Sequence, residues 1–314
     1  MKILVTGCYG FIASHFIKRL INSSEHHIIG VSRNTYQVNR QRLEGYEHHE
    51  RLQIAYQDLN DPNIVESLED VDVVVNFAAK TFVDYSVRDT KPFFESNVLG
   101  THNLLEAVHK YTHIKKFVQI STDEVYGPLP DDIHGWKESA TLNPTNPYSA
   151  TKAASDMLCM GYCQTFKIPL LITRTENNYG PYQHPQKVIP NWVRRAMNNQ
   201  KLQIYGDGLH KRMWLRVEDN VRAIQLLIEG DATGIYHIAG SQEMDNITLA
   251  RMVLSTLGRS EDMIEFIDDS KIRPNHDRRY GLDTSKISNE FGWAPRWGLS
   301  GIEDAVRWFR DRHV

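Results

Sequence analysis

Hydrophobic and polar positions alternate along the first 170 residues in a way that predicts strands and helices in turn. Short apolar runs have the length and β-branched content of strands buried on both faces of a sheet, at residues 2–5, 27–31, 52–56, 71–77 and 117–120. Segments with helical period lie between and after these runs, at residues 11–22, 92–111 and 148–166. This order predicts an α/β fold, a doubly wound parallel sheet with right-handed crossovers.

The pattern loosens in the second half of the chain. An apolar run at 169–173 is followed by a polar turn at 174–181. We then expect helices that begin near residue 187 and at 214 and 249, and short strands at 203–205, 235–238 and 264–267. The helix at 214 is predicted to end at 229 and the helix at 249 to end at 257. We therefore predict a Rossmann domain over residues 1–172 and a smaller C-terminal α/β domain over residues 173–314, some of which packs back on the large sheet.

The composition excludes several classes of protein. The 314 residues are 41% hydrophobic and 24% charged, with a net charge of -3, so neither nucleic acid nor an anionic membrane is expected as the main partner. No apolar stretch is long enough for a signal peptide or a membrane span. Cys8, Cys159 and Cys163 are too few for a disulfide framework, which favours a reducing, cytoplasmic location. Cys159 and Cys163 are spaced for a metal or redox pair, but buried thiols are the commoner case, and no metal site is expected.

The first predicted strand runs into a glycine-rich turn with the pattern G-x-x-G-x-x-A, from Gly7 to Ala13. Glycines let such a turn tighten, and the backbone N–H groups at the start of the next helix favour a pyrophosphate. The turn lies directly between a strand and an amphipathic helix, which is the context that the motif requires. We therefore expect a dinucleotide beside this turn, in contact with Gly7, Tyr9, Gly10, Phe11 and Ile12.

The second predicted strand ends in Ser32, Arg33 and Asn34, where an acidic residue would bind the ribose diol of NAD. An arginine at this point accommodates the 2′-phosphate of NADP, although it is also compatible with a solvated loop. The sequence therefore favours NADP as the cofactor, with NAD as the alternative.

Later strand ends carry further candidates for this cofactor site. Asp58 is placed to face an adenine or to cap a helix that Pro62 begins, and the small pair Ala78–Ala79 would let a cofactor lie close. The carboxyl ends of parallel strands lie at one edge of a sheet, so these segments and the glycine turn should meet in one crevice. The remaining predicted cofactor contacts are Asp58, Leu59, Phe77, Ala78, Ala79, Asn97, Ser121, Tyr148 and Lys152.

The strand at 117–120 leads into Ser121, Thr122, Asp123 and Glu124, and the helix at 148–166 begins with Tyr148 and Lys152. Residues at i and i+4 share a helix face, so the lysine is expected to lower the pKa of the tyrosine toward that of a general base. The adjacent carboxyl groups of Asp123 and Glu124 offer a second acid and base, which oxidation of an alcohol alone would not require.

The densest basic cluster of the chain covers residues 273–279 and includes three arginines and His276. Such a cluster suits a diphosphate through bidentate guanidinium contacts, and a solvated loop is the alternative.

These motifs together resemble the extended short-chain dehydrogenase/reductases (extended SDR) that act on nucleotide sugars. More narrowly, five segments resemble the nucleoside-diphosphate-glucose 4,6-dehydratases, with dTDP-glucose 4,6-dehydratase as the nearest type, at residues 121–127, 177–182, 187–190, 205–208 and 273–279. The resemblance covers nearly the whole chain in order, and its most specific part is the run Thr122–Asp123–Glu124.

The resemblance implies a reaction in three stages. Tyr148, helped by Lys152 and Thr122, takes the proton of the sugar 4-hydroxyl while a hydride passes to the nicotinamide. Glu124 then removes the proton at carbon 5 and Asp123 protonates the leaving 6-hydroxyl, so that water is lost. Hydride returns to carbon 6 and leaves a 4-keto-6-deoxy sugar.

The resemblance also implies substrate contacts and a homodimer. The predicted contacts with the nucleoside-diphosphate sugar are Thr81, Phe82, Asn177, Lys187, Val188, Tyr205, Arg212, Asn246, Arg273 and His276. Helices at 92–111 and 148–166 would pair with their copies in the dimer, whereas periodicity is equally consistent with burial inside one subunit.

The chain departs from the family pattern around the sugar. Lys80, Thr81 and Phe82 stand where Glu-Ser-His is frequent, and Tyr85 stands where arginine is frequent. Further departures are Thr175, Glu176, Met213 and Arg216. Two rival functions remain open: a nucleotide-sugar 4-epimerase or reductase, which needs no second acid and base, and a dinucleotide-binding module without turnover.

Overall fold

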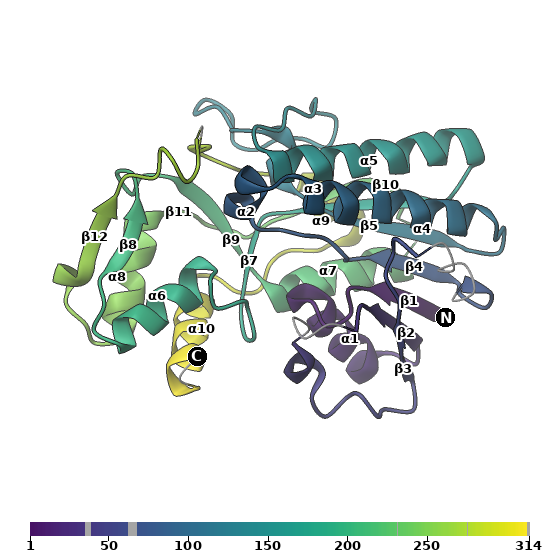
Figure 1. Ribbon diagram of the computed structural model, residues 1–314, viewed down its shortest axis with the longest axis horizontal. Helices are drawn as coiled ribbons and strands as arrows, with labels where there is room; N and C mark the ends of the chain where they lie inside the picture. The colour runs from purple at the N-terminus through teal and green to yellow at the C-terminus, as the bar shows by residue number, and fades with distance from the viewer. Residues whose placement is uncertain (35–38, 62–67, 231, 275, 313–314) are drawn as a thin grey trace.

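The computed structural model describes residues 1–34, 39–61, 68–230, 232–274 and 276–312. Within them, seven parallel strands form one sheet in the order β10-β6-β5-β4-β1-β2-β3 (Figure 1). The strands are β1 (Lys2–Thr6), β2 (His27–Ser32), β3 (Leu52–Tyr56), β4 (Val73–Asn76), β5 (Lys116–Thr122), β6 (Leu170–Thr175) and β10 (Gly234–Ile238). The predicted doubly wound α/β fold is confirmed.

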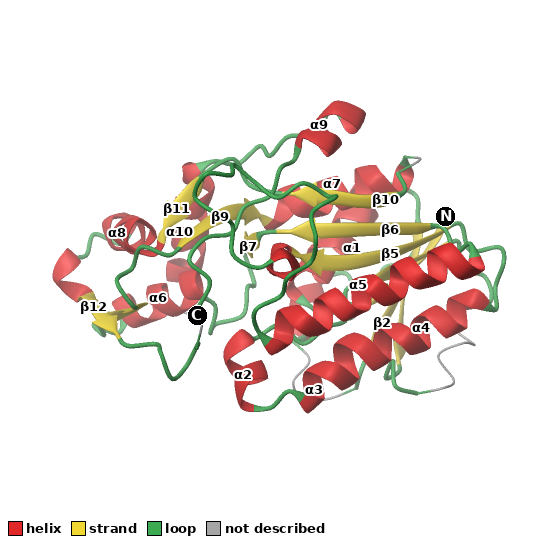
Figure 2. Ribbon diagram, turned by 90° about the horizontal axis from the view of Figure 1, so that it is seen from above, coloured by secondary structure: helices red, strands yellow, loops and turns green. Residues whose placement is uncertain are grey.

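Helices cover both faces of this sheet (Figure 2). On one face, α1 (Phe11–Ser23) packs beside α7 (Val217–Glu229), and a core that includes Phe16, Leu20 and Ile224 lies between them and the strands. On the other face lie α4 (Gly100–His109) and α5 (Pro147–Phe166), over a second core. Before α4, the predicted single helix is divided into α3 (Lys91–Phe93) and a π-helical stretch (Phe94–Leu99), and α2 (Val83–Arg88) precedes both.

The smaller part of the molecule lies beyond the carboxyl ends of the strands, at the left of Figure 1. It contains a three-stranded sheet of β7 (Asn177–Tyr179), β9 (Lys211–Arg216) and β11 (Glu243–Asp245), and a parallel pair of β8 (Leu202–Tyr205) and β12 (Ile264–Ile267). Three helices, α6 (Val188–Met197), α8 (Asn246–Thr256) and α10 (Leu299–Asp311), enclose a third core around Trp192, Val253 and Phe309.

Three elements from the second half of the chain belong to the large sheet and its covering helices rather than to this smaller part. Strand β10 forms its edge beside β6, and α9 (Ser285–Phe291) packs on β10, where Phe291 contacts Tyr236 edge-on. Helix α7 packs against α1 on the same sheet. The domain boundary between residues 172 and 173 itself stays a prediction.

Some predicted elements are wrong in their extent. The helix expected at 214–229 begins only at Val217, because Trp214, Leu215 and Arg216 pair with β7 as the last residues of β9. The polar turn expected at 174–181 contains the end of β6 and all of β7. Buried apolar residues in a short run do not distinguish a strand from a helix, and only the pairing partners decide between them. The helix that Pro62 was expected to begin lies outside the described residues.

Candidate active site

The predicted catalytic residues lie where β5 ends and α5 begins. After β5, residues Asp123–Tyr126 form a single 3-10 turn, in which side chains cap the backbone N–H of Glu124. The N–H of Glu124 donates to Oγ1 of Thr122 at 3.3 Å and to Oδ1 of Asp123 at 3.0 Å, and the Thr122 hydroxyl donates to the same Oδ1 at 2.9 Å. The side chains of Thr122 and Asp123 are therefore held by each other and by the backbone of the turn.

Helix α5 begins with a capping box that fixes Tyr148 in its first turn. The Asn146 side chain accepts from the Ser149 N–H at 2.9 Å, and the Ser149 hydroxyl accepts from the Asn146 N–H at 3.2 Å. Because Pro147 suits the first helical position, the sequence itself determines where this helix starts. The Asn146 amide also donates to Oε2 of Glu124 at 3.3 Å, so that the cap joins the two halves of the site.

The expectation that Lys152 lowers the pKa of Tyr148 is wrong for this structure. The Lys152 ammonium donates to the carbonyl of Ile120 at 2.7 Å, inside the protein. Burial raises the pKa of Tyr148 well above its ordinary value, and the carboxyl groups of Glu124 and Asp123 raise it further, whereas a hydrogen bond with Thr122 acts in the opposite direction. Burial and the two carboxyl groups thus favour the protonated phenol, so the phenolate that can act as a base is the minor form.

The two adjacent carboxyl groups differ in their surroundings. Burial raises the pKa of Asp123 to about 7, and the charge of Glu124 adds to this effect. Burial also raises the pKa of Glu124, but the cations of Lys187, Arg212 and Arg273 oppose the rise. A carboxylic acid that keeps its proton near neutral pH can act as an acid, and its neighbour close to three cations is the better candidate for a carboxylate base.

A cavity of about 490 Å³ opens beside Glu124, between the large sheet and the smaller part of the molecule. All ten predicted substrate contacts line it, namely Thr81, Phe82, Asn177, Lys187, Val188, Tyr205, Arg212, Asn246, Arg273 and His276. Of the five predicted catalytic residues, Glu124 lines this cavity, while Thr122, Asp123, Tyr148 and Lys152 are buried next to it. The volume is within the range of small-molecule sites.

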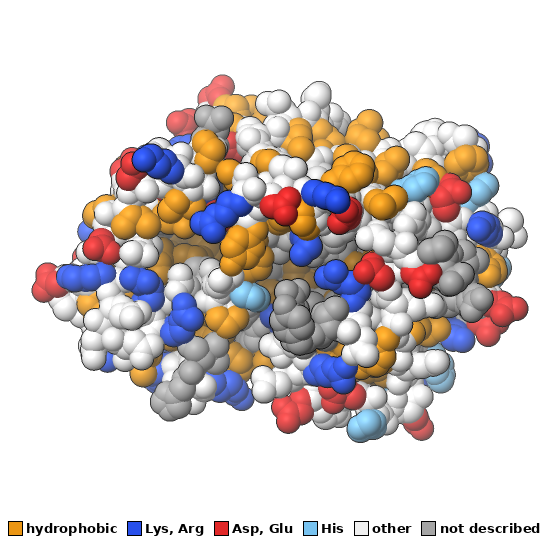
Figure 3. Space-filling model, in the orientation of Figure 1, with side chains coloured by type: hydrophobic (Ala, Val, Ile, Leu, Met, Phe, Trp, Pro, Cys, Tyr) orange, Lys and Arg blue, Asp and Glu red, His pale blue; other side chains and the backbone are white. Residues whose placement is uncertain are grey.

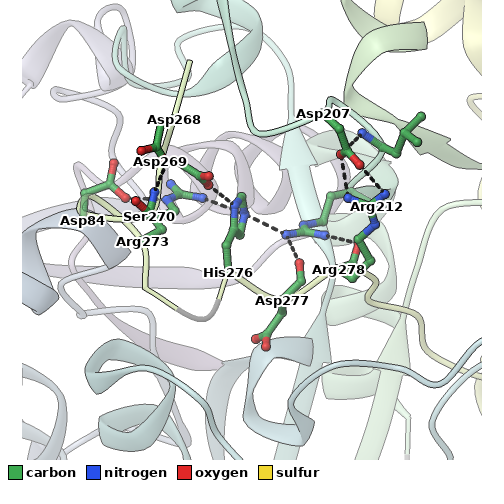
Figure 4. Close-up of polar contacts among 11 residues, drawn as sticks. Asp84, Asp207, Arg212, Asp268, Asp269, Ser270, Arg273, His276, Asp277 and Arg278 are labelled. Atoms are coloured by element: carbon green, nitrogen blue, oxygen red, sulfur yellow. Dashed lines mark hydrogen bonds and ion pairs between the residues drawn. The ribbon is translucent and has the colours of Figure 1, made fainter. Parts of the chain in front are cut away.

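One wall of this cavity is a connected cluster of cations and carboxylates (Figure 4). Arg273 pairs with Asp84, and Nη2 of Arg212 donates to Nε2 of His276 at 3.2 Å and to the carbonyl of Asp277 at 2.9 Å. Burial and the two arginines lower the pKa of His276 to about 2, so the ring is neutral. Its Nδ1–H then donates to Asp269 at 2.7 Å, as a hydrogen bond rather than an ion pair.

Cations are concentrated inside the cavity compared with the outer surface of the molecule. Over the face of the molecule in Figure 3, basic and acidic side chains are interspersed, in keeping with the net charge of -3. Inside the cavity, by contrast, Lys187, Arg212 and Arg273 converge, and the Lys187 ammonium lies 4.4 Å from the centre of the Phe82 ring. Three cations in a partly enclosed space favour an anionic ligand.

A second cavity, of about 420 Å³, lies at the edge of the sheet formed by the ends of β1, β2 and β4. Ten of the predicted cofactor contacts line it: Gly7, Tyr9, Gly10, Ser32, Arg33, Asp58, Leu59, Phe77, Ala78 and Ala79. Gly7 has a φ of +63°, and a Cβ atom there would lie 3.1 Å from Cα of Ala78, so only glycine allows this close approach. The residues present fit a dinucleotide laid along a glycine turn.

The other predicted cofactor contacts do not line this cavity, and several have structural partners. The Asn97 amide donates to the carbonyl of Lys80 at 3.0 Å and to Thr151 at 2.9 Å, and the Ser121 hydroxyl donates to Asp156 at 3.0 Å. The Asn34 side chain accepts from Arg40 at 2.9 Å. The remaining predicted residues that lie outside the cavity lining are Phe11, Ile12, Tyr148 and Lys152.

Residues that the sequence analysis did not single out as ligand contacts also line the two cavities. They include Asn39, Arg42 and Gln57 in the second cavity, and Asn146, Gln186, Trp214 and Tyr280 in the first. None of them belongs to a motif that could have been found by spacing, although Asn146 precedes a proline as a helix cap does. Across the described ranges, three or more His, Cys, Asp or Glu side chains nowhere gather as a metal would require, and no described helix is long and apolar enough to span a membrane.

Comparison with known proteins extends this description. The family model for GDP-mannose 4,6 dehydratase matches residues 4–305. The chain is 42% identical to the low-salt glycan biosynthesis protein Agl12 of Haloferax volcanii over 98% of both chains, and 39% identical to the dTDP-glucose 4,6-dehydratase of Streptomyces niveus over 100% of this chain and 94% of the relative.

Solved structures give the same relation. The crystal structure of DesIV, a dTDP-glucose 4,6-dehydratase from Streptomyces venezuelae with NAD bound, has a TM-score of 0.94 at 38% identity and covers 99% of this chain and 97% of its own. A UDP-glucuronic acid 4-epimerase from Bacillus cereus has a TM-score of 0.93 at 28% identity, covering 99% and 100%. By its sequence and by its structure, the chain belongs to the GDP-mannose 4,6 dehydratase family of extended short-chain dehydrogenases.

Proposed function

We propose that the protein is a nucleotide-sugar 4,6-dehydratase that converts a nucleoside-diphosphate hexose of the dTDP-glucose or UDP-glucose type to the 4-keto-6-deoxy sugar. The observation that carries the proposal is the pair of Asp123 and Glu124, an acid with a pKa of about 7 next to a carboxyl group that faces a cation-lined cavity. A relative that is 39% identical over the whole chain is a dTDP-glucose 4,6-dehydratase.

The first step is assigned to Tyr148, which as a phenolate accepts the proton of the sugar 4-hydroxyl. When it is bound, the nicotinamide supplies the chemistry of accepting a hydride from the sugar and returning it. Because burial raises the pKa of Tyr148, the phenol binds a proton firmly once it has received one. The Thr122 hydroxyl and the Lys152 ammonium hold the end of β5 and the first turns of α5 around it.

The second step is the loss of water, and it needs a base and an acid on neighbouring carbons of the sugar. Glu124, whose charge is stabilised by Lys187, Arg212 and Arg273, removes the proton at carbon 5 and returns it there when carbon 6 has received the hydride. Asp123, protonated up to about pH 7, gives its proton to the departing 6-hydroxyl. The same three cations hold the diphosphate of the substrate in this cavity.

The cofactor is a nicotinamide dinucleotide, and we infer that it is NADP, with NAD as the alternative. No carboxylate follows β2 in Ser32, Arg33 and Asn34, and Arg33 lines the second cavity. An exposed guanidinium there suits a ribose 2′-phosphate. The relative DesIV binds NAD, so the two cofactors must be compared directly.

A panel of dTDP-, UDP- and GDP-hexoses, followed by mass spectrometry, tests the function. We expect a product lighter than its substrate by one water, with the hydride of carbon 4 recovered at carbon 6 when deuterium labels carbon 4. A product of unchanged mass, with the configuration inverted at carbon 4, would instead identify a 4-epimerase, the activity of a structural relative. Cofactor binding without any product would identify a non-enzymatic module.

We also propose that the protein is a homodimer in the cytoplasm. Large apolar side chains are exposed along the outer side of α5 and the helical segment before α4, at Phe94, Leu99, Met157, Met160 and Phe166. Such a stripe fits a pairing of these helices with their copies. Analytical ultracentrifugation should find a dimer, and Met157→Lys should weaken it.

The proposed cytoplasmic location is supported by the cysteines. The thiols of Cys8, Cys159 and Cys163 form no disulfide, as is typical of a reducing compartment.

A further inference from the structure

A third carboxyl group, that of Glu176, is buried beside the acid and base pair and has no part in the mechanism above. Glu176 follows β6 directly and is only 3% exposed. Carboxylates are almost never buried without a partner, because the loss of hydration disfavours the charge. The surroundings of this side chain therefore need an explanation.

Only one of the two oxygens of Glu176 is accounted for. Oε1 accepts the N–H of Leu282 at 2.8 Å, and the backbone of Gly240 also bonds to the carboxyl group. Oε2 is buried and has no hydrogen-bond partner among the described residues. A buried oxygen without a hydrogen-bond partner is costly. The cost is removed if this oxygen carries a proton and donates it to a nearby acceptor.

Asp123 also has one buried oxygen without a hydrogen-bond partner among the described residues. Its Oδ1 accepts from the Thr122 hydroxyl and the Glu124 N–H, whereas Oδ2 is buried and has no partner within the described ranges. Strands β5 and β6 are adjacent and parallel, with Thr122 opposite Thr175 in register. Asp123 directly follows β5, and Glu176 directly follows β6. Two buried carboxyl groups, each with one oxygen that has no partner among the described residues, therefore lie next to each other at the end of the sheet.

We propose that Glu176 stays protonated and donates a hydrogen bond from its carboxyl group to Oδ2 of Asp123, as a positioning residue for the acid of the elimination step. Two carboxylates cannot both be ionised in so small a buried space, whereas an acid and a carboxylate form a strong hydrogen bond. With this bond, each of the four oxygens of the pair has a partner.

The charges around the pair agree with this assignment. Burial raises the pKa of Glu176 well above its ordinary value, and Asp123 has the largest effect of any charged group, with Glu243 of β11 adding to it. Around Asp123 lie Glu124, which raises its pKa, and Arg212 of β9, which lowers it. Glu176 therefore keeps its proton after Asp123 has lost its own.

The consequence for catalysis rests on the proposed function. When Asp123 gives its proton to the leaving hydroxyl, the negative charge remains on a buried carboxylate. Thr122 and the Glu124 N–H stabilise that charge at Oδ1, and Glu176 stabilises it at Oδ2 without giving up its proton. Removing this donor should raise the pKa of Asp123 and make it a weaker acid.

The first test is independent of turnover. Infrared spectra of the whole protein at about pH 8, above the pKa of Asp123, report the C=O stretch of carboxyl groups that remain protonated. We expect such a band in the wild type and its loss in Glu176→Gln. If the difference spectrum of the two proteins contains no protonated carboxyl band, Glu176 is ionised and the proposal is wrong, whatever reaction the protein catalyses.

The second test is the pH profile of dehydration with the nucleotide sugar that the panel identifies. In Glu176→Met, which has no donor, the basic limb of kcat should move to higher pH by about one unit and kcat should fall about tenfold. Glu176→Gln keeps an N–H donor of similar length and should restore both. If Glu176→Met does not fold, the infrared comparison of the wild type with Glu176→Gln decides alone.

A matched control comes from the same strand. Thr173 of β6 is fully buried and its hydroxyl has no partner in the described part of the chain, so Thr173→Val removes a polar group without touching the pair. We expect its basic limb to stay in place. An equal shift in Thr173→Val and Glu176→Met would assign the effect to packing and overturn the proposal.

Discussion

The two cavities of this protein are built in different ways. The cavity proposed for the cofactor, here called the cofactor cavity, is lined by residues between positions 7 and 96, and most of them follow directly after a strand of the large sheet. The substrate cavity is lined by segments that are scattered between residues 81 and 280, from both parts of the molecule. The cofactor cavity is formed by short segments that each follow a strand along one edge of the sheet. The substrate cavity forms only when segments that are distant in the sequence pack together.

This difference places the chemistry at the boundary between the two. The end of β5 and the start of α5 hold Tyr148, Asp123 and Glu124 by local caps. The cations that stabilise the charge of Glu124 come from the residue before α6, from β9 and from the loop at 273–279. Changes on the two sides of this boundary should therefore have effects of different kinds. Local residues should affect the rate, and scattered residues should affect binding.

The largest effect is expected for Tyr148→Phe, which removes the group that receives the first proton. General acid and base groups contribute about 10²–10⁴-fold, and this step precedes all others, so kcat should fall by about 10⁴-fold. Absorbance of the reduced nicotinamide should not appear in a single turnover. Tyr162→Phe is the control and should keep its activity, because Tyr162 lies on the same helix but its hydroxyl donates to Glu106, away from the site. Product formation by Tyr148→Phe at a normal rate would remove Tyr148 from the mechanism.

Glu124→Gln should separate oxidation from elimination. The amide keeps the shape of the side chain but cannot remove the proton at carbon 5, so the dehydrated product should form about 10²–10³-fold more slowly. Reduced nicotinamide should accumulate on the enzyme to a visible level, since the first step remains. If the product appears at the wild-type rate, Glu124 is not the base. Asp131→Asn, an exposed site on the loop before α5, controls for the loss of one negative charge.

On the binding side of the boundary, Arg273→Ala should raise KM about 10- to 100-fold and change kcat much less, because a charged hydrogen bond to a ligand is worth about 1.5–3 kcal/mol. Arg278 belongs to the same basic cluster, but its guanidinium pairs with Asp207 at 2.6 Å near the surface. Arg278→Ala should leave KM within about twofold. Equal losses in the two variants would mean that overall charge, not the position of Arg273, attracts the substrate.

In the cofactor cavity, Arg33→Ala should weaken NADP about tenfold and leave NAD nearly unchanged, because only the 2′-phosphate requires the cation. Isothermal titration of the two cofactors measures this ratio in one protein, so that any general damage to the site cancels. Equal losses for both cofactors, or a wild type that binds NAD alone, would rule out recognition of the phosphate by Arg33.

The smallest expected effect is on stability. The pKa of Asp123 is about 7 in the folded protein and near 4 when unfolded, so the folded state binds the extra proton between these values. The free energy of unfolding therefore falls as the pH rises through this window, and the loss is complete above about pH 7. Asp123→Asn has no such proton, and its free energy of unfolding should fall less by at least about 1 kcal/mol in urea titrations at about pH 5 and 8. A parallel dependence in both proteins would contradict the burial of this charge.

Much of the site could be predicted because its chemistry lies in short motifs. The glycine turn, the run from Thr122 to Glu124 and the start of α5 are contiguous, and each follows or precedes a clear element. The predicted substrate contacts came from resemblance to a family, and these ten residues do line one cavity. Periodicity did not find β9, because Trp214 and Leu215 at its end directly precede the apolar positions of α7 and fit the helical period equally well.

The sequence by itself determined the parallel sheet, its glycine turn and the order of the chemical groups at the strand ends, because these depend on backbone geometry within a few residues. The tertiary structure decided the protonation of those groups. Burial of Tyr148 reversed the pKa shift expected from its neighbour Lys152, and the register of β5 and β6 brought Glu176 beside Asp123. Solvation and charge depend on every segment that packs around a site, and no local pattern contains that information.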